Sequence, residues 1–212
     1  MAQRAMMFLL PFVLIGLSRL GTETSLRLFS LRGALIAAPA VYYALIAVSV
    51  RLVRRLVPGA GSALSLYSGR RPAAWRVALA IALPALPLFI FFIRSLAPIA
   101  PAAVAGVIVF ALVNGTLEET FWRGVMAHLP ARDWVRIVYP AAVFSFMHWF
   151  NFLVYVPLAP VRAQVLLVST FLLGCLWMWF YLRERSLVFP IASHVAIDAF
   201  AVLSAAMSFH RR

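Results

Sequence analysis

The chain has 212 residues, of which 65% are hydrophobic and 12% are charged, and its mean hydropathy is +0.97. This leaves too little polar surface to coat a water-soluble globule, so the composition excludes a soluble enzyme and indicates an all-α, polytopic membrane protein. The net charge of +13 comes from 19 arginines, which fall mostly at the ends of apolar runs. We interpret them as topology and headgroup anchors and expect no nucleic-acid partner.

A membrane-spanning helix needs roughly 20 apolar residues. The first apolar stretch, 6–17, is shorter, follows Arg4 and contains Pro11, so it could be a signal peptide, a signal anchor or an interfacial helix. We count it as a seventh helix within a range of six to eight. Six further stretches are long enough to span a bilayer: 33–50, 73–93, 98–128, 135–156, 161–182 and 187–209.

The arginines also suggest an orientation. The connection 51–76 holds six arginines and that at 183–185 holds two, whereas the connections near Arg94 and Arg162 hold one each. Arginine-rich connections face the cytoplasm under the positive-inside rule. The two C-terminal arginines would then lie outside, against the trend. We expect a multi-pass protein of a bacterial inner (plasma) membrane.

The rare acids are the main functional signal. Only six carboxylates occur, and Glu118 and Glu119 stand side by side at the end of the apolar stretch 101–117. Acids inside a membrane are costly and are functional by default. Glu119 and Arg123 are four residues apart on one helix face, so the guanidinium can neutralise Glu119. Glu118 points about 100° away and stays available for chemistry.

Two histidines lie at a depth similar to that of Glu118. Glu118, His148 and His194 are each roughly nine to twelve residues from loops at one end of the bundle, around Pro130 and Arg185. At about 1.5 Å per residue, all three lie on the order of 13 to 20 Å from the same membrane face. The sequence therefore predicts one shared site, with a cavity that opens toward the face bearing these loops.

The same four-residue spacing recurs on the two later helices. Phe144 precedes His148 by four residues and places an aromatic wall beside the imidazole. His194 and Asp198 have the same spacing, which lets the carboxylate fix the imidazole tautomer or lets both side chains face one reacting atom.

These motifs, in this order, resemble the signature of the CAAX-processing and bacteriocin-protection family. Its members are glutamic-type intramembrane proteases that include the Ras-converting CAAX endopeptidase. The resemblance covers 114–200 and implies an all-helical membrane fold around a water-filled cavity. It rests on Glu118-Glu119-x-x-x-Arg123, Phe144-x-x-x-His148 and His194-x-x-x-Asp198.

The resemblance also implies a role for each residue. Glu118 would be the base that activates water, and His148 would hold that water. His194 and Asp198 would stabilise the oxyanion, while Glu119 and Arg123 would support the site. The family often has Asn where this chain has Asp198. An ionised Asp198 cannot donate to an oxyanion, so it could instead orient His194 or be protonated.

We therefore predict one membrane domain, 1–212, with a catalytic core at 95–210 and accessory N-terminal helices at 1–94. The predicted function is cofactor-free hydrolysis of a peptide bond in a membrane-associated protein or peptide. One alternative is a zinc-dependent membrane protease, because two histidines and a carboxylate also suit zinc, although no His-Glu-x-x-His run occurs. Another is a non-catalytic transporter or immunity protein, with Glu118 as a proton relay.

Overall fold

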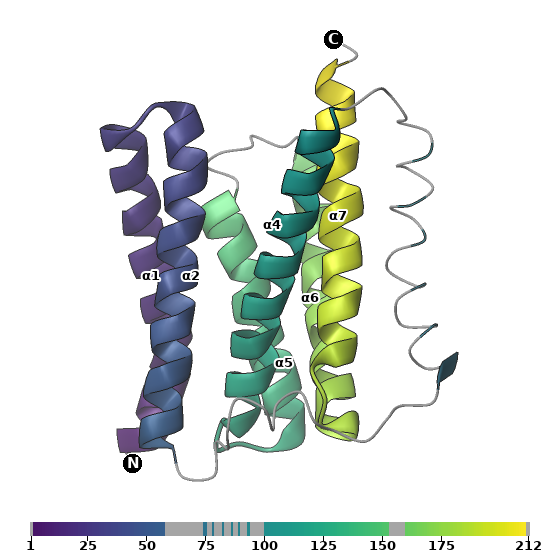
Figure 1. Cartoon of the computed structure of the whole chain (residues 1–212). Coiled ribbons are helices and arrows are strands. Elements are labelled where there is room, and N and C mark those ends of the chain that lie inside the picture. Colours follow the sequence, from purple (N-terminus) through teal and green to yellow (C-terminus); the bar gives the residue numbers. More distant parts are fainter. Residues whose placement is uncertain are drawn as a thin grey trace.

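The computed structural model describes residues 2–57, 100–152 and 160–210, together with seven positions between 74 and 93. These residues are helical, joined by short turns, and form six long α-helices (Figure 1). A π-helix (η2, Thr120–Val125) and a 3-10 turn (η3, Met126–His128) continue α4, and a second π-helix (η4, His148–Phe152) continues α5. The α-helices are α1 (Ala2–Leu28), α2 (Leu31–Leu56), α4 (Pro101–Glu119), α5 (Asp133–Met147), α6 (Pro160–Glu184) and α7 (Val188–His210).

The polytopic membrane fold is confirmed in its main features. Within the described part of the chain, four helical stretches are long and apolar enough to cross a membrane, namely Gln3–Leu28, Gly33–Leu56, Pro101–His128 and Ala163–Glu184. Val188–Ser204 is a shorter apolar helix. Most of the predicted helix 73–93 and most of the arginine-rich connection 51–76 lie outside the described residues, so the count of seven helices is not shown.

The prediction of a short first helix at 6–17 is wrong, because α1 runs unbroken from Ala2 to Leu28. The sequence suggested an early end because polar residues follow Leu17. Two of these residues form an ion pair one turn apart on the helix, in which Arg19 Nε donates to Glu23 Oε1 at 2.7 Å. Arg19 Nη1 also donates to the Phe150 carbonyl oxygen at 2.9 Å, which ties α1 to η4.

The helices associate mainly as three pairs: α1 with α2, α4 with α7, and α5 with α6 (Figure 1). Glycine allows close approach within each pair. A Cβ atom added at Gly115 in α4 would lie 2.9 Å from Val195 Cγ2 and 3.2 Å from the Val195 backbone nitrogen in α7. One added at Gly174 in α6 would lie 2.9 Å from Ala141 Cβ in α5.

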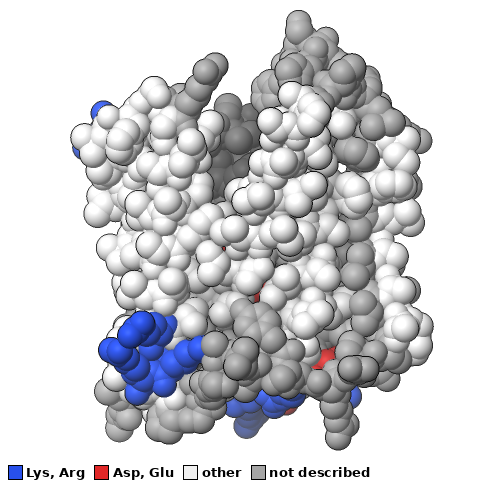
Figure 2. Space-filling view, viewed as in Figure 1, with Lys and Arg blue, Asp and Glu red and all other residues white. Residues whose placement is uncertain are grey.

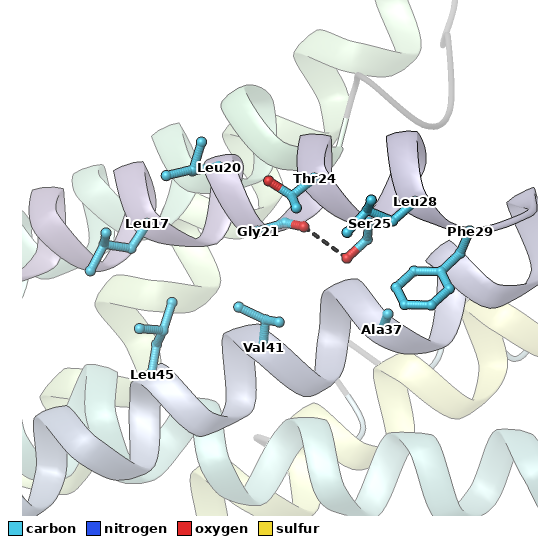
Figure 3. Close-up of a pocket in the computed structure, with 10 residues that line it drawn as sticks. All are labelled: Leu17, Leu20, Gly21, Thr24, Ser25, Leu28, Phe29, Ala37, Val41 and Leu45. Atoms are coloured by element: carbon cyan, nitrogen blue, oxygen red, sulfur yellow. Dashed lines mark hydrogen bonds between the residues drawn. The ribbon is translucent and has the colours of Figure 1, made fainter.

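The α1–α2 pair carries a shallow groove of about 450 Å³ on its surface (Figure 3). Its walls are mostly apolar side chains, and the Ser25 hydroxyl in it donates to the Gly21 carbonyl at 2.8 Å. A Cβ added at Gly21 would lie 2.7 Å from Val41 Cγ1, so the two helices touch here. The groove holds no acid or histidine, and we assign it to helix packing.

Arginines gather at one end of the bundle, drawn at the bottom of Figures 1 and 2. This end holds the start of α1, the end of α2, the η3–α5 turn and the α6–α7 turn. The opposite end holds the α1–α2 turn and the start of α4. The described arginines of the first end, called here the arginine-rich end, are Arg4, Arg51, Arg54, Arg55, Arg132, Arg136, Arg183 and Arg185.

The close contact at Gly115 gives a test of the α4–α7 packing. We expect Gly115→Ala to lower the free energy of unfolding by about 1 to 3 kcal/mol, because the β-branched Val195 and its backbone cannot move aside freely. Gly106→Ala, on the same helix with nothing within 4 Å, should leave stability unchanged or slightly higher. Thermal unfolding in detergent compares the two, and equal stability would contradict the packing.

Candidate active site

A cavity of about 580 Å³ lies among α1, α2, α4, α5, α6 and α7. Three of the predicted site residues on different helices line it: Glu118 on α4, His148 at the start of η4 and His194 on α7. Phe144 and Asp198 line it as well. The structure therefore brings the three helices together around one space, as the shared depth of the two imidazoles and the acid predicted.

The predicted direction of the cavity is wrong. From Glu118 the lining continues toward the end opposite the arginine-rich end, through Leu35 near the start of α2, Phe110 on α4, Leu166 near the start of α6 and Val202 on α7. In Figure 2 the surface between the α1–α2 pair and α4 is hollowed in its upper half, and acidic atoms are visible in the crevice below.

Apolar packing explains this difference. Between Glu118 and the Pro130 loop, the side chains of Phe121, Trp122, Met126 and Leu129 are each at most 1% exposed. They fill the space between the carboxylates and the arginine-rich end. The polar groups lie at a similar depth, as predicted. A cavity can nevertheless be closed at the membrane face to which its polar groups are nearest.

Glu119 is the ionic centre of the site. Its side chain is fully buried, and its Oε1 atom lies 3.0 Å from Arg123 Nη1, so the ion pair predicted from the spacing is present. The same oxygen lies 2.7 Å from His194 Nδ1 on α7. Because a carboxylate can only accept, the Nδ1 atom of His194 carries the hydrogen of this contact. Glu119 thus holds both the guanidinium and the imidazole in place.

Arg123 is held by aromatic rings as well as by charge. Its guanidinium carbon lies 4.7 Å from the Phe144 ring centroid and 4.8 Å from that of Trp177. The side chain is only 1% exposed and lies beside Gly174 of α6. Cation–π contacts of this kind strengthen when water is excluded.

Glu118 is not paired with an arginine, as predicted, but it is not free. Its Oε1 atom accepts a hydrogen bond of 2.8 Å from the Tyr42 hydroxyl of α2. Its Oε2 atom lies 3.5 Å from His194 Nε2 and accepts no hydrogen bond from the described residues. One oxygen of this carboxylate is therefore anchored, while the other is a buried acceptor beside the cavity.

His194 is enclosed by carboxylates and one aromatic face. Its Nε2 atom lies 3.5 Å from Asp198 Oδ2 as well as from Glu118 Oε2, so both ring nitrogens face acidic oxygens. The ring stacks on Trp177 at 4.8 Å between centroids and an interplanar angle of 19°. The predicted His194–Asp198 contact is present, and the imidazole has little freedom to rotate.

Asp198 is the final acceptor in a short series of hydrogen bonds. Its Oδ2 atom accepts from Asn114 Nδ2 at 2.9 Å, and Asn114 Oδ1 accepts from the Tyr43 hydroxyl at 3.0 Å. Asn114 stands one helical turn before Glu118 on α4. This series of hydrogen bonds links α2, α4 and α7 across the cavity.

The two ring nitrogens of His148 have different hydrogen-bonding roles. Nδ1 lies 2.9 Å from the Phe144 carbonyl oxygen, so it donates there and leaves Nε2 with its lone pair. The ring meets the Phe144 ring edge to face, with centroids 4.5 Å apart and planes at 75°. The predicted aromatic wall is therefore present, and it also fixes the tautomer that His148 presents.

Both π-helices adjoin site residues. The first, η2, follows Glu119 directly and contains Arg123, and the second, η4, begins at His148. Short π-helical turns are uncommon and are frequent at functional sites, because they change the direction in which side chains leave the helix. The spacing of residues in the sequence does not show these turns.

The sequence analysis missed four residues of the site. Tyr42, Tyr43, Asn114 and Trp177 all line the cavity, and three of them hydrogen-bond directly to a carboxylate or to a partner of one. A signal was present for Asn114, which lies four residues before Glu118 in an apolar stretch. The tyrosines come from the segment 1–94 that we described as accessory. No group of three or more metal-ligating side chains has the geometry of a metal site within the described ranges.

Comparison with family models gives one match. Residues 100–200, just under half of the chain, match the family described as type II CAAX prenyl endopeptidase Rce1-like. The family resemblance is confirmed over this segment. The Rce1-like segment holds α4, α5, α6 and most of α7, and it includes the six predicted catalytic residues Glu118, Glu119, Arg123, His148, His194 and Asp198. Comparison with curated proteins and with solved structures gave no match.

Thiol labelling tests the direction of the cavity. In a Cys175→Ala background, we expect Ala38→Cys, which lines the cavity, to react with a small membrane-impermeant reagent added from one side of sealed vesicles. Ala131→Cys, beside the η3–α5 turn, should react only from the other side. Ala111→Cys is the control, because Ala111 is buried and does not line the cavity. Labelling of Ala38→Cys and Ala131→Cys from the same side would contradict the observed direction.

Proposed function

We propose that the protein is an intramembrane endopeptidase that hydrolyses a peptide bond of a membrane-associated protein or peptide with water activated by Glu118. The observation that carries this proposal is the different environment of the two adjacent acids. Glu119 is committed to Arg123 and His194 through its Oε1 atom and does not line the cavity. Glu118 has no arginine partner among the described residues, lines the cavity, and has an Oε2 atom that accepts no hydrogen bond from them. The Rce1-like match over residues 100–200 supports the same reaction class.

Water activation needs a base and a second contact that positions the water. Glu118 Oε2 can accept one water hydrogen, while the Tyr42 hydrogen bond to Oε1 keeps the carboxylate plane from turning. His148 Nε2 keeps its lone pair because Nδ1 donates to the Phe144 carbonyl. It is the second acceptor for the same water. In this assignment the two residues aim the water oxygen at the scissile carbonyl carbon.

The attack places negative charge on the carbonyl oxygen, which needs a donor fixed in advance. His194 supplies Nε2–H for this purpose. Because its Nδ1 atom also carries a hydrogen, the ring is an imidazolium in this assignment, and the carboxylates that face both nitrogens stabilise its charge. Glu119 anchors the opposite side of the ring through Nδ1, and Trp177 stacks on its face, so the donor does not have to reorganise during the reaction. The proton taken up by Glu118 then passes to the leaving amine, which completes the hydrolysis without a covalent intermediate.

The arginine distribution suggests the side from which a substrate enters. The positive-inside rule places the arginine-rich end in the cytoplasm. Because the cavity lining runs toward the opposite end, the cavity would open toward the non-cytoplasmic side of the membrane. This reverses the expectation from sequence, in which the site and the arginines shared an open face.

Glu118→Gln tests the proposed base. The amide keeps the size of the side chain but cannot take a proton, so we expect the cleavage rate of a membrane-tethered peptide library to fall about 10² to 10⁴-fold. Glu23→Gln makes the same change at a half-exposed glutamate in α1 and should leave cleavage intact. A folded Glu118→Gln protein that cleaves at the wild-type rate would rule out this mechanism.

Chelation separates this mechanism from a zinc-dependent one. We expect dialysis against a strong chelator to leave the cleavage rate unchanged. The physical reason is that the donors are already engaged: both His194 nitrogens face carboxylates, and Glu119 pairs with Arg123. Elemental analysis of the purified protein accompanies the assay. Stoichiometric zinc that is lost together with activity, and that restores activity when added back, would support the metal-dependent alternative.

A further inference from the structure

Asn114 is a polar side chain in the middle of an apolar helix. It lies on α4 one turn before Glu118, lines the same cavity, and has buried or half-buried neighbours on α2 and α7. A primary amide has two N–H donors and one acceptor oxygen. Its hydrogen bonds therefore show which of its groups remain available to a ligand.

The partners of Asn114 determine how its amide is oriented. The Oδ1 atom accepts from the Tyr43 hydroxyl at 3.0 Å, and the Nδ2 atom donates to Asp198 Oδ2 at 2.9 Å. A rotated amide would place its oxygen against a carboxylate oxygen, and two acceptors repel each other. The orientation of the amide is thus set from both sides, and one of the two Nδ2 hydrogens has no partner among the described residues.

Asn114 and His194 share one acceptor. Asn114 Nδ2 and His194 Nε2 both contact the same Oδ2 atom of Asp198, at 2.9 Å and 3.5 Å. The two nitrogens are therefore at most about 6.4 Å apart, a distance that one oxygen atom hydrogen-bonded to both can span. His194 Nε2 also lies 3.5 Å from Glu118 Oε2. The Oδ2 atom of Asp198 is already engaged as an acceptor, since it accepts from Asn114 and faces His194.

We propose that Asn114 is a catalytic residue whose free amide hydrogen binds the oxyanion together with His194 Nε2–H. Tyr43 and Asp198 act as positioning residues for this amide. The inference rests on the proposed protease function and deepens it. During water attack, the carbonyl π electrons move onto oxygen, and Asn114 donates a hydrogen bond to that oxygen without losing its proton. When the tetrahedral intermediate collapses and the amine leaves, the hydrogen bond weakens again.

Asn114→Leu tests the assignment, because leucine has a similar size and no donor. We expect kcat for the membrane-tethered peptide to fall about 10² to 10³-fold with KM nearly unchanged. Two inhibitors give a second readout. A phosphinate peptide, which mimics the tetrahedral oxyanion, should bind more weakly by a similar factor. A reduced-amide peptide, which has no oxygen at that position, should bind as it does to wild type.

Val113→Leu is the matched control, since it introduces the same side chain on the lipid-facing side of α4, where Val113 is 40% exposed. It should leave kcat and both inhibitor affinities unchanged. Tyr43→Phe removes the donor to Asn114 Oδ1, and we expect a smaller fall in kcat, about 2- to 10-fold, as for one neutral hydrogen bond. If Asn114→Leu does not fold, Asn114→Ala is measured with the same two inhibitors.

The outcomes distinguish this inference from the proposed function. If Glu118→Gln abolishes cleavage while Asn114→Leu behaves like Val113→Leu, the protease assignment stands and the role of Asn114 is wrong. Equal weakening of the phosphinate and reduced-amide peptides would also overturn it, because that pattern reports a general distortion of the cavity. If the wild-type protein cleaves no member of the peptide library, the proposed function itself fails.

Discussion

The structure depends on keeping three carboxylates, one guanidinium and one imidazole inside an apolar bundle. Such groups cost several kcal/mol each when buried alone. Here they compensate one another through Glu119, whose single Oε1 atom contacts both Arg123 and His194. Removing Glu119 would leave the buried guanidinium of Arg123 without its carboxylate partner. The ionic group therefore links η2 to α7 more firmly than apolar contact alone would do.

Two aromatic rings pack against this ionic group. Phe144 and Trp177 face the guanidinium of Arg123 from α5 and α6, and Trp177 also stacks on His194. A ring that contacts both cations fixes their separation without competing for the carboxylate. A different set of apolar side chains, Phe121, Trp122, Met126 and Leu129, fills the arginine-rich side of the site.

Local spacing explains how much of the site could be predicted from sequence. The pairs Glu119–Arg123 and His194–Asp198 contact as predicted, because the i, i+4 rule operates within one helix. The contacts of Tyr42 and Tyr43 escaped prediction because they join residues more than 70 positions apart, on helices without a distinguishing pattern. The direction of the cavity was wrong for a related reason. Depth along a helix follows from counting residues, whereas the closing of one end depends on which apolar side chains meet there.

The adjacent tyrosines give the N-terminal helices a direct part in the site. Neighbouring residues on a helix point about 100° apart, so Tyr42 and Tyr43 reach different targets from one turn of α2. Tyr42 contacts Glu118, and Tyr43 reaches Asp198 through Asn114. A small rotation or shift of α2 would change both contacts at once. The position of α2 beside α4 therefore couples the orientation of the proposed base to that of the proposed oxyanion donor, although α2 lies outside the Rce1-like segment.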